Sequence, residues 1–250
     1  MKVIAINGSP HPQGNTFHAL KTIGEELKKE NIEFEILQVG SQNIHGCMGC
    51  NMCFRNKNEK CVITTDSFNE LLQKIKDVDG IILGSPVHFS GIAGTMKCFL
   101  DRAFYVSGAN GNWFRHKVGT AIVAVRRSGG SHTLDGLYHY LSYSEMLIPS
   151  SNYWNIIHGL KAGEAIQDAE GNQIMRVLGK NMATENERAN KRYTYSPGNR
   201  NQNNNKLHPV NENTPISFAE KLYFIMKENK YDDEIFFNQY SQMSRSCLLY

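Results

Sequence analysis

One turn-forming stretch governs how this sequence can fold: Asn7-Gly8-Ser9-Pro10-His11-Pro12-Gln13-Gly14-Asn15-Thr16. It follows the apolar run Val3-Ile4-Ala5-Ile6 and precedes a segment with helical spacing, so it joins a strand to a helix. Its small residues let the backbone bend tightly, and successive amide N–H groups at the helix N-terminus can then converge on an anion. Ser9, Asn15 and Thr16 add short polar side chains that can cap the helix or bind phosphate oxygens. We therefore interpret the stretch as a phosphate-binding turn.

The kind of phosphate ligand can be narrowed by elimination. A Walker loop carries a Lys directly after its second glycine, and here Asn15 stands after Gly14. A dinucleotide-binding fold needs an acidic residue near the end of its second strand, which here ends in Gln38-Val39-Gly40. A single terminal phosphate fits the turn better than either. The alternative is a Gly/Pro loop that binds nothing.

The overall composition narrows the class of protein. A chain of 250 residues can bury a full core, which suggests one large domain or one domain with an addition. The net charge of +3 is small and the basic residues are scattered, so nothing indicates a nucleic-acid partner. No apolar run approaches the length of a membrane span, and no charged-then-apolar leader precedes the first strand. We expect a cytoplasmic protein with no nucleic-acid and no membrane partner.

Strand and helix patterns alternate along the chain. After the N-terminal strand, the spacing of apolar residues predicts helices over 16–29, 67–78, 94–105, 133–146 and 170–187, and strands over 32–39, 81–83, 119–125 and 146–157. The helix at 67 opens on a capping box, Ser67-Phe68-Asn69-Glu70. Such alternation indicates a parallel sheet with helices on both faces.

In parallel sheets of this kind, ligands bind beyond the carboxyl ends of the strands, so the loops after strands one, three and four should converge. The loop after the third strand, Gly84–Gly91, has a rigid start, two aromatic rings and a flexible end, which suits the edge of a flat conjugated ring. The loop after the fourth, Arg126-Arg127-Ser128-Gly129-Gly130, offers donors followed by glycines that permit close backbone approach. Those donors could bind ring carbonyls and stabilise negative charge on a reduced ring.

Together these stretches resemble the NAD(P)H-dependent FMN reductase and iron–sulfur flavoprotein group of the flavodoxin-like fold, over residues 1 to about 187. The matching stretches are Ile6–Pro10 with Gly14–Thr16, a run of cysteines, Gly84–Phe89, Lys97–Arg102, Arg127–Gly130, Tyr153–Asn155 and Leu178–Ala183. The resemblance implies an α/β fold, a flavodoxin-like doubly wound five-stranded parallel sheet of order 2-1-3-4-5. It implies an FMN-binding domain over residues 1–190. The composition then predicts an Asn-rich linker over 191–213 and a helical C-terminal extension over 214–250.

With that resemblance, the loops give a set of expected FMN-binding residues: Ser9, His11, Asn15 and Thr16 for the phosphate, and Pro86, Val87, His88, Phe89, Arg127, Ser128 and Gly129 for the ring. No residue is expected as a catalytic acid or base, because the chemistry belongs to the cofactor. We expect Asp101 and Arg102 to form a helix-surface pair that binds no ligand.

Four cysteines follow the second strand at short spacing: Cys47-x2-Cys50-x2-Cys53-x7-Cys61. The triplet resembles the start of a bacterial ferredoxin run, whereas zinc sites more often use two separated pairs. Cys61 could complete Cys₄ ligation, and the compact arrangement matches the motif of the iron–sulfur flavoproteins. Spacing alone leaves three alternatives open: a [4Fe-4S] cluster, free thiols, and zinc or disulfides.

These patterns predict a flavoprotein that accepts a hydride from NAD(P)H on FMN and passes electrons to a small acceptor, a free flavin or quinone, or to an iron–sulfur centre. The alternative is a non-enzymatic electron-transfer flavoprotein or a thiol-based redox sensor. The expected partners are a small-molecule electron donor and acceptor, together with further copies of the chain in a homodimer or homotetramer.

Overall fold

The computed structural model of the chain describes residues 1–194. Helix α6, Ala169–Thr194, continues to the last of them and so extends into the first residues of the expected 191–213 linker. The rest of that linker and the expected helical extension over 214–250 lie outside the described residues. No helix within the described part is both long and apolar enough to span a bilayer.

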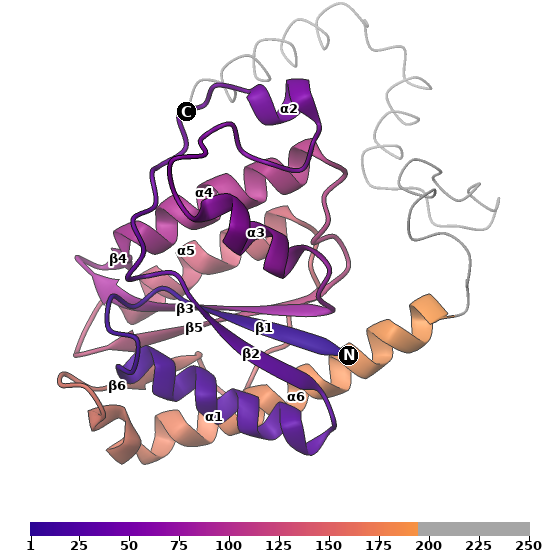
Figure 1. Cartoon of the computed structure of the whole chain (residues 1–250). Helices are drawn as coiled ribbons and strands as arrows, with labels where there is room; N and C mark the ends of the chain where they lie inside the picture. Colours follow the sequence, from indigo (N-terminus) through magenta and orange to yellow (C-terminus); the bar gives the residue numbers. More distant parts are fainter. Residues whose placement is uncertain (195–250) are drawn as a thin grey trace, which may run out of the picture. The chain divides into compact units, whose positions relative to one another are not determined.

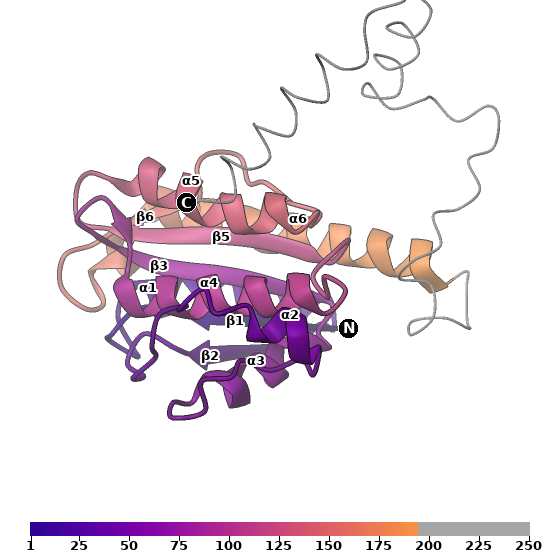
Figure 2. The same cartoon turned by 90° about the horizontal axis from the view of Figure 1, so that it is seen from above.

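A parallel sheet forms the centre of this part of the chain, with its strands in the order β2-β1-β3-β5-β6 (Figure 2). The strands are β1 Lys2–Asn7, β2 Glu33–Gln38, β3 Gly80–His88, β5 Val118–Val125 and β6 Ile156–His158. The two-residue strand β4, Gly91–Ile92, folds back antiparallel on the end of β3. Counting the parallel strands alone, the expected order 2-1-3-4-5 is confirmed.

Helices cover both faces of the sheet (Figure 1). On one face lie α1, Asn15–Lys29, and α6, and on the other lie α3 Phe68–Lys76, α4 Gly94–Ala109 and α5 Gly130–Tyr143. Each face has its own cluster of buried apolar side chains. All of β5 is buried, as its largely apolar sequence predicts for a strand covered on both sides.

The strand expected over 146–157 is wrong for most of its length. Only Ile156–His158 pairs with β5, and before it Leu147 makes an isolated bridge to Val118. Pro149, which has no N–H to donate, separates the two, and its carbonyl accepts the Thr120 hydroxyl. The run, interrupted by proline, therefore joins the sheet only at Leu147 and again from Ile156 onward.

The predicted capping box at Ser67 is wrong in its detail although the helix α3 begins where expected. The Ser67 hydroxyl donates to Gln42 Oε1 at 3.4 Å and does not cap the helix. Asp66 takes over that role, because its Oδ1 accepts the Phe68 amide at 3.2 Å.

Candidate functional site

The turn after β1 is held in place by the end of β2. The Ser9 amide donates to Asn7 Oδ1 at 3.1 Å, and Asn7 Nδ2 donates to Gln38 Oε1 at 2.7 Å. Gln38 Nε2 in turn donates to the Ser9 carbonyl at 2.8 Å. The side chains of Asn7, at the end of β1, and of Gln38, at the end of the adjacent strand β2, therefore fix the turn. Sequence reasoning used Gln38 only to exclude a dinucleotide and missed this supporting role.

The N-terminus of α1 presents unpaired donors at this turn. Its N-cap residue is Gly14, and no side chain caps the helix. Within the described residues, the amides of Asn15, Thr16 and Phe17 and the buried Thr16 hydroxyl donate no hydrogen bond. First-turn amides at the positive end of a helix dipole are a ready-made anion site. The local geometry is thus that of a phosphate cradle.

Asn15 has a second task that the sequence does not reveal. Its Oδ1 accepts the amides of Gly163 at 3.0 Å and Ala165 at 3.2 Å, and its Nδ2 donates to the Lys161 carbonyl at 2.9 Å. The side chain therefore fastens the loop after β6 against the turn, so only the backbone N–H of Asn15 faces an anion site unpaired.

The loops after β3 and β5 meet, as expected. Ser85 fixes the start of the first loop: its hydroxyl donates to the Pro86 carbonyl at 2.8 Å and accepts the Ala93 amide at 3.0 Å. Gly129, at φ +83°, lies so close to Ser90 that an added Cβ would stand 2.7 Å from the Ser90 Oγ. The turn after β1 joins this edge through the Gly8 amide, which donates to the Gly84 carbonyl at 2.8 Å.

Several side chains that we expect to bind FMN stand in solvent at this edge. Phe89 is fully exposed with a positive φ of 50°, and His11, His88, Arg127 and Ser128 are also exposed. Within the described residues, the side chains of these last four make no hydrogen bond or ion pair, so they are free to bind a ligand.

All four predicted cysteines line one pocket. Cys47, Cys50, Cys53 and Cys61 surround it together with Tyr105 and Arg102, and every one of these thiols is free. The pocket lies in the connection between β2 and α3 that contains the short helix α2, Met52–Asn56. Among the described residues, no three His, Cys, Asp or Glu side chains are placed to hold a single metal ion.

The thiols are close enough to affect one another electrostatically. Burial raises the pKa of Cys53 above its ordinary value, and charge on Cys47 and Cys61 raises it further. Burial likewise raises the pKa of Tyr105, with added contributions from Cys53 and Cys47. A cation at the pocket would reverse this preference, because it favours thiolates.

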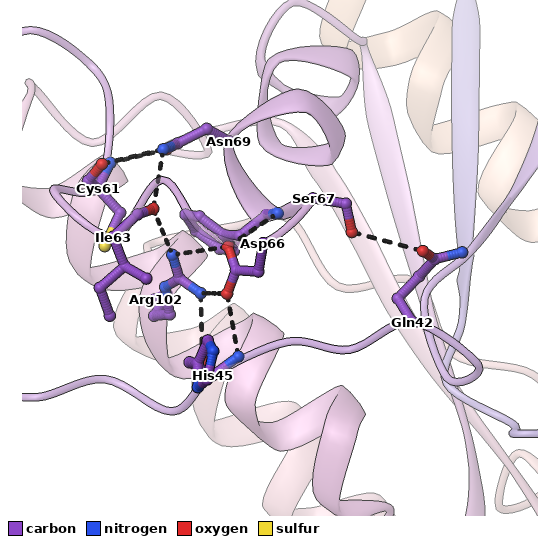
Figure 3. A network of polar contacts seen from close by, with 9 residues as sticks. Gln42, His45, Cys61, Ile63, Asp66, Ser67, Asn69 and Arg102 are labelled. Atoms are coloured by element: carbon purple, nitrogen blue, oxygen red, sulfur yellow. Dashed lines mark hydrogen bonds and ion pairs between the residues drawn. The ribbon is translucent and has the colours of Figure 1, made fainter.

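Arg102 and Asp66 hold the two ends of the cysteine-bearing connection together, as Figure 3 shows. Arg102 Nη1 donates to the Asp66 carboxylate at 2.5 Å and to the His45 carbonyl at 3.2 Å, while Nη2 donates to the Ile63 carbonyl at 3.2 Å. Asn69 continues the network, accepting the Cys61 amide at 2.8 Å. These bonds tie the segments before and after the cysteine run, at His45 and at Ile63, to α3 and α4.

The expectation that Asp101 and Arg102 form a surface pair is wrong. The Arg102 side chain is 1% exposed and pairs with Asp66, itself 1% exposed. Asp101 instead pairs with Lys97 at 2.8 Å and accepts the Tyr140 hydroxyl. Adjacent helical residues point about 100° apart, so one of the two faces the core. The spacing of residues within one helix could not predict that an acidic residue from another segment pairs with Arg102 in the core.

Comparison with known proteins identifies the family of this chain. Residues 1–161 match the family model described as NADPH-dependent FMN reductase. The chain belongs to that family. It is also 35% identical, over 190 residues, to an iron–sulfur flavoprotein of Methanocaldococcus jannaschii, covering 73% of this chain and 96% of the relative. A second iron–sulfur flavoprotein of that organism is 31% identical over 70% of this chain and 92% of its own.

Solved structures agree on the fold of this FMN reductase family member. The structure of RosB with a bound 8-demethyl-8-formylriboflavin-5'-phosphate superposes with a TM-score of 0.62, covering 87% of this chain and 94% of that one. At 17% sequence identity the likeness shows the fold alone. The fold is flavodoxin-like, as the sequence predicted, and membership in the family makes the chain an FMN-dependent oxidoreductase.

Proposed function

We propose that the chain accepts a hydride from NADH or NADPH on bound FMN and passes electrons to a small acceptor, a free flavin or quinone, or onward through a [4Fe-4S] cluster. The observation that carries the FMN part is the cradle of unpaired amides at Asn15–Phe17, beside two converging loops. When bound, FMN supplies the redox chemistry. The chain supplies the site around it.

The side chains divide this work by position. The amides of Asn15, Thr16 and Phe17 and the Thr16 hydroxyl hold the terminal phosphate. The loops Pro86–Phe89 and Arg127–Gly129 border the ring. Arg127, exposed and unpaired in the described part of the chain, would stabilise negative charge on the bound ring.

Support for the cluster comes from the pocket and from the names of the two relatives. In a cubane each thiolate binds a different iron, so its four sulfur ligands stand apart rather than around one atom. Here four cysteines line one pocket, and the spacing of Cys47, Cys50 and Cys53 resembles a ferredoxin run more than the two separated pairs usual for zinc. We infer a [4Fe-4S] cluster on Cys47, Cys50, Cys53 and Cys61.

The test begins with full-length protein purified without oxygen. We expect released cofactor to be FMN by mass spectrometry, and iron and sulfide near four of each per chain. Adding NADPH or NADH should reduce the flavin and sustain turnover with free flavin or a quinone. FAD as the main cofactor contradicts the single-phosphate cradle. Slow oxidation of both nucleotides contradicts the enzyme and favours an electron carrier that works with protein partners.

A further inference from the structure

Arg102 has one donor that the protein does not use. Its two terminal nitrogens are occupied by Asp66, His45 and Ile63. Its Nε, by contrast, is fully buried and has no hydrogen-bond partner within the described residues. A buried, unpaired donor is energetically costly, and native proteins hold few of them. Such an atom calls for an acceptor.

The guanidinium is fixed on its other sides. Asp66 and the two carbonyls hold its outer edge, and the Phe68 ring lies against its face, with the ring centroid 3.9 Å from Cζ. Asp66 has no capacity left for Nε, because its oxygens already accept from Arg102, His45 and Phe68. Only the edge that carries Nε is left for a ligand.

Arg102 also lines the pocket of the four cysteines. Thiolate and sulfide sulfurs accept hydrogen bonds, and a cluster held there would bring several of them into the pocket with a net negative charge. A buried cationic donor beside such a group gains both a hydrogen bond and an electrostatic attraction. Arg102, whose Nε lacks an acceptor, therefore lines the pocket in which a bound cluster would supply acceptors.

We propose that Arg102 Nε–H donates a hydrogen bond to a sulfur of the iron–sulfur cluster, or to one of its cysteine ligands, and thereby raises the reduction potential of the cluster. The inference rests on the cluster in the proposed function. Hydrogen bonds to cluster sulfurs are a principal means by which proteins set this potential. Arg102 thus both holds the connection around the cysteines and tunes the centre they bind.

The first experiment compares full-length wild type, Arg102→Lys and Arg55→Lys, all purified without oxygen. Lysine keeps the charge opposite Asp66 but has no Nε–H. Arg55, on α2 between the cysteines, is exposed and serves as the matched control. In a redox titration, Arg102→Lys should lower the ratio of reduced to oxidised cluster roughly tenfold at fixed potential, about 59 mV for one electron. Arg55→Lys should leave the ratio unchanged.

The second experiment uses wild type and so does not depend on the variant folding. Protein labelled with ¹⁵N-arginine, with its cluster reduced, should show a ¹⁵N coupling in pulsed electron paramagnetic resonance, and Arg55→Lys should keep it. Absence of the coupling, or an unchanged potential in a cluster-loaded Arg102→Lys protein, overturns the inference and leaves the proposed function standing. Wild type without iron and sulfide overturns the inference and the proposed cluster together.

Discussion

Thr16 is the residue at which the phosphate cradle can be tested alone. Its hydroxyl is unpaired within the described residues, while its methyl packs near Gly84, so Thr16→Val keeps the shape and removes one donor. We expect FMN binding to weaken by about 1.5–3 kcal/mol, the value of a hydrogen bond to a charged group. Fluorescence titration of apoprotein with FMN measures it.

Thr22→Val is the control for that change. Thr22 lies on the same helix, and its hydroxyl donates to the His18 carbonyl at 3.1 Å, away from the turn. Its FMN affinity should match wild type. Equal affinity in all three proteins would place the phosphate elsewhere.

Asp66 makes the connection around the cysteines sensitive to acid. Burial alone would raise the pKa of its carboxyl, but hydrogen bonds from Arg102 and the His45 amide lower it below the ordinary value of 3.8. Since the folded pKa is the lower one, the stabilising contribution is full above about pH 5 and is lost as the pH falls through the folded pKa. Asp66→Asn should cost about 3 kcal/mol at pH 7, because it leaves Arg102 buried without its counter-ion.

Denaturant unfolding of the apoprotein at pH 7 and pH 3 checks this prediction. The difference between wild type and Asp66→Asn should shrink at the lower pH. Glu25→Gln, at an exposed pair with Lys21, should cost less than about 1 kcal/mol at either pH. If the difference in the free energy of unfolding is the same at both pH values, the contribution of Asp66 does not depend on its charge.

At the scale of elements, the close approach of the β3 and β5 loops depends on Gly129. Gly129→Ala puts a methyl against Ser90 and strains a positive φ, so the loops must separate. We expect FMN affinity to fall roughly tenfold, about 1.4 kcal/mol. Gly163→Ala has a similar φ, +88°, but nothing within 4 Å of the added methyl. The backbone strain alone should lower the free energy of unfolding of Gly163→Ala by about 1–2 kcal/mol. Its FMN affinity should fall less than that of Gly129→Ala when both variants are titrated with FMN in a calorimeter.

The connection between β2 and α3 is the element that the cluster would order. Cys50→Ser should remove iron, sulfide and broad absorption near the flavin bands, and should speed hydrogen exchange over residues 45–65, while FMN stays bound. Electron delivery to one-electron partners should fall more than NADPH oxidation with a flavin acceptor. Cys98→Ser, at a half-buried thiol on α4, should change none of these. Identical iron content in both variants would exclude Cys50 as a ligand.

At the scale of the whole molecule, we propose that the chain forms a homodimer or homotetramer. Large apolar side chains stand exposed at Phe89, in the loop after β3, and at Tyr153 and Trp154, just before β6, the last two with ring centroids 4.7 Å apart. Exposed apolar patches commonly mark protein interfaces. Light scattering should give a multiple of the 28.3 kDa chain mass, and Tyr153→Ser with Trp154→Ser should reduce it. A monomeric wild type would contradict the proposal.

The sequence by itself determined the alternation of strands and helices, the turn of residues 7–16 and the cysteine spacing. These are local properties, because periodicity, turn chemistry and ligand spacing act over a few residues. Given the family resemblance, they sufficed for the strand order, while the residues of the cradle stay a prediction. The convergence of the loops after β1, β3 and β5 followed from the rule for parallel sheets.

Only the tertiary structure decided what side chains meet across the fold. Asn15 is sequence-adjacent to the cradle, yet its side chain binds a loop almost 150 residues away. Arg102 looks like a surface residue until Asp66, from another segment, is seen to neutralise it in the core. Most of the strand predicted over 146–157 does not form, because Pro149 interrupts it and β6 lies at the edge of the sheet. Burial and pairing of polar groups depend on partners distant in sequence, and no local pattern records who those partners are.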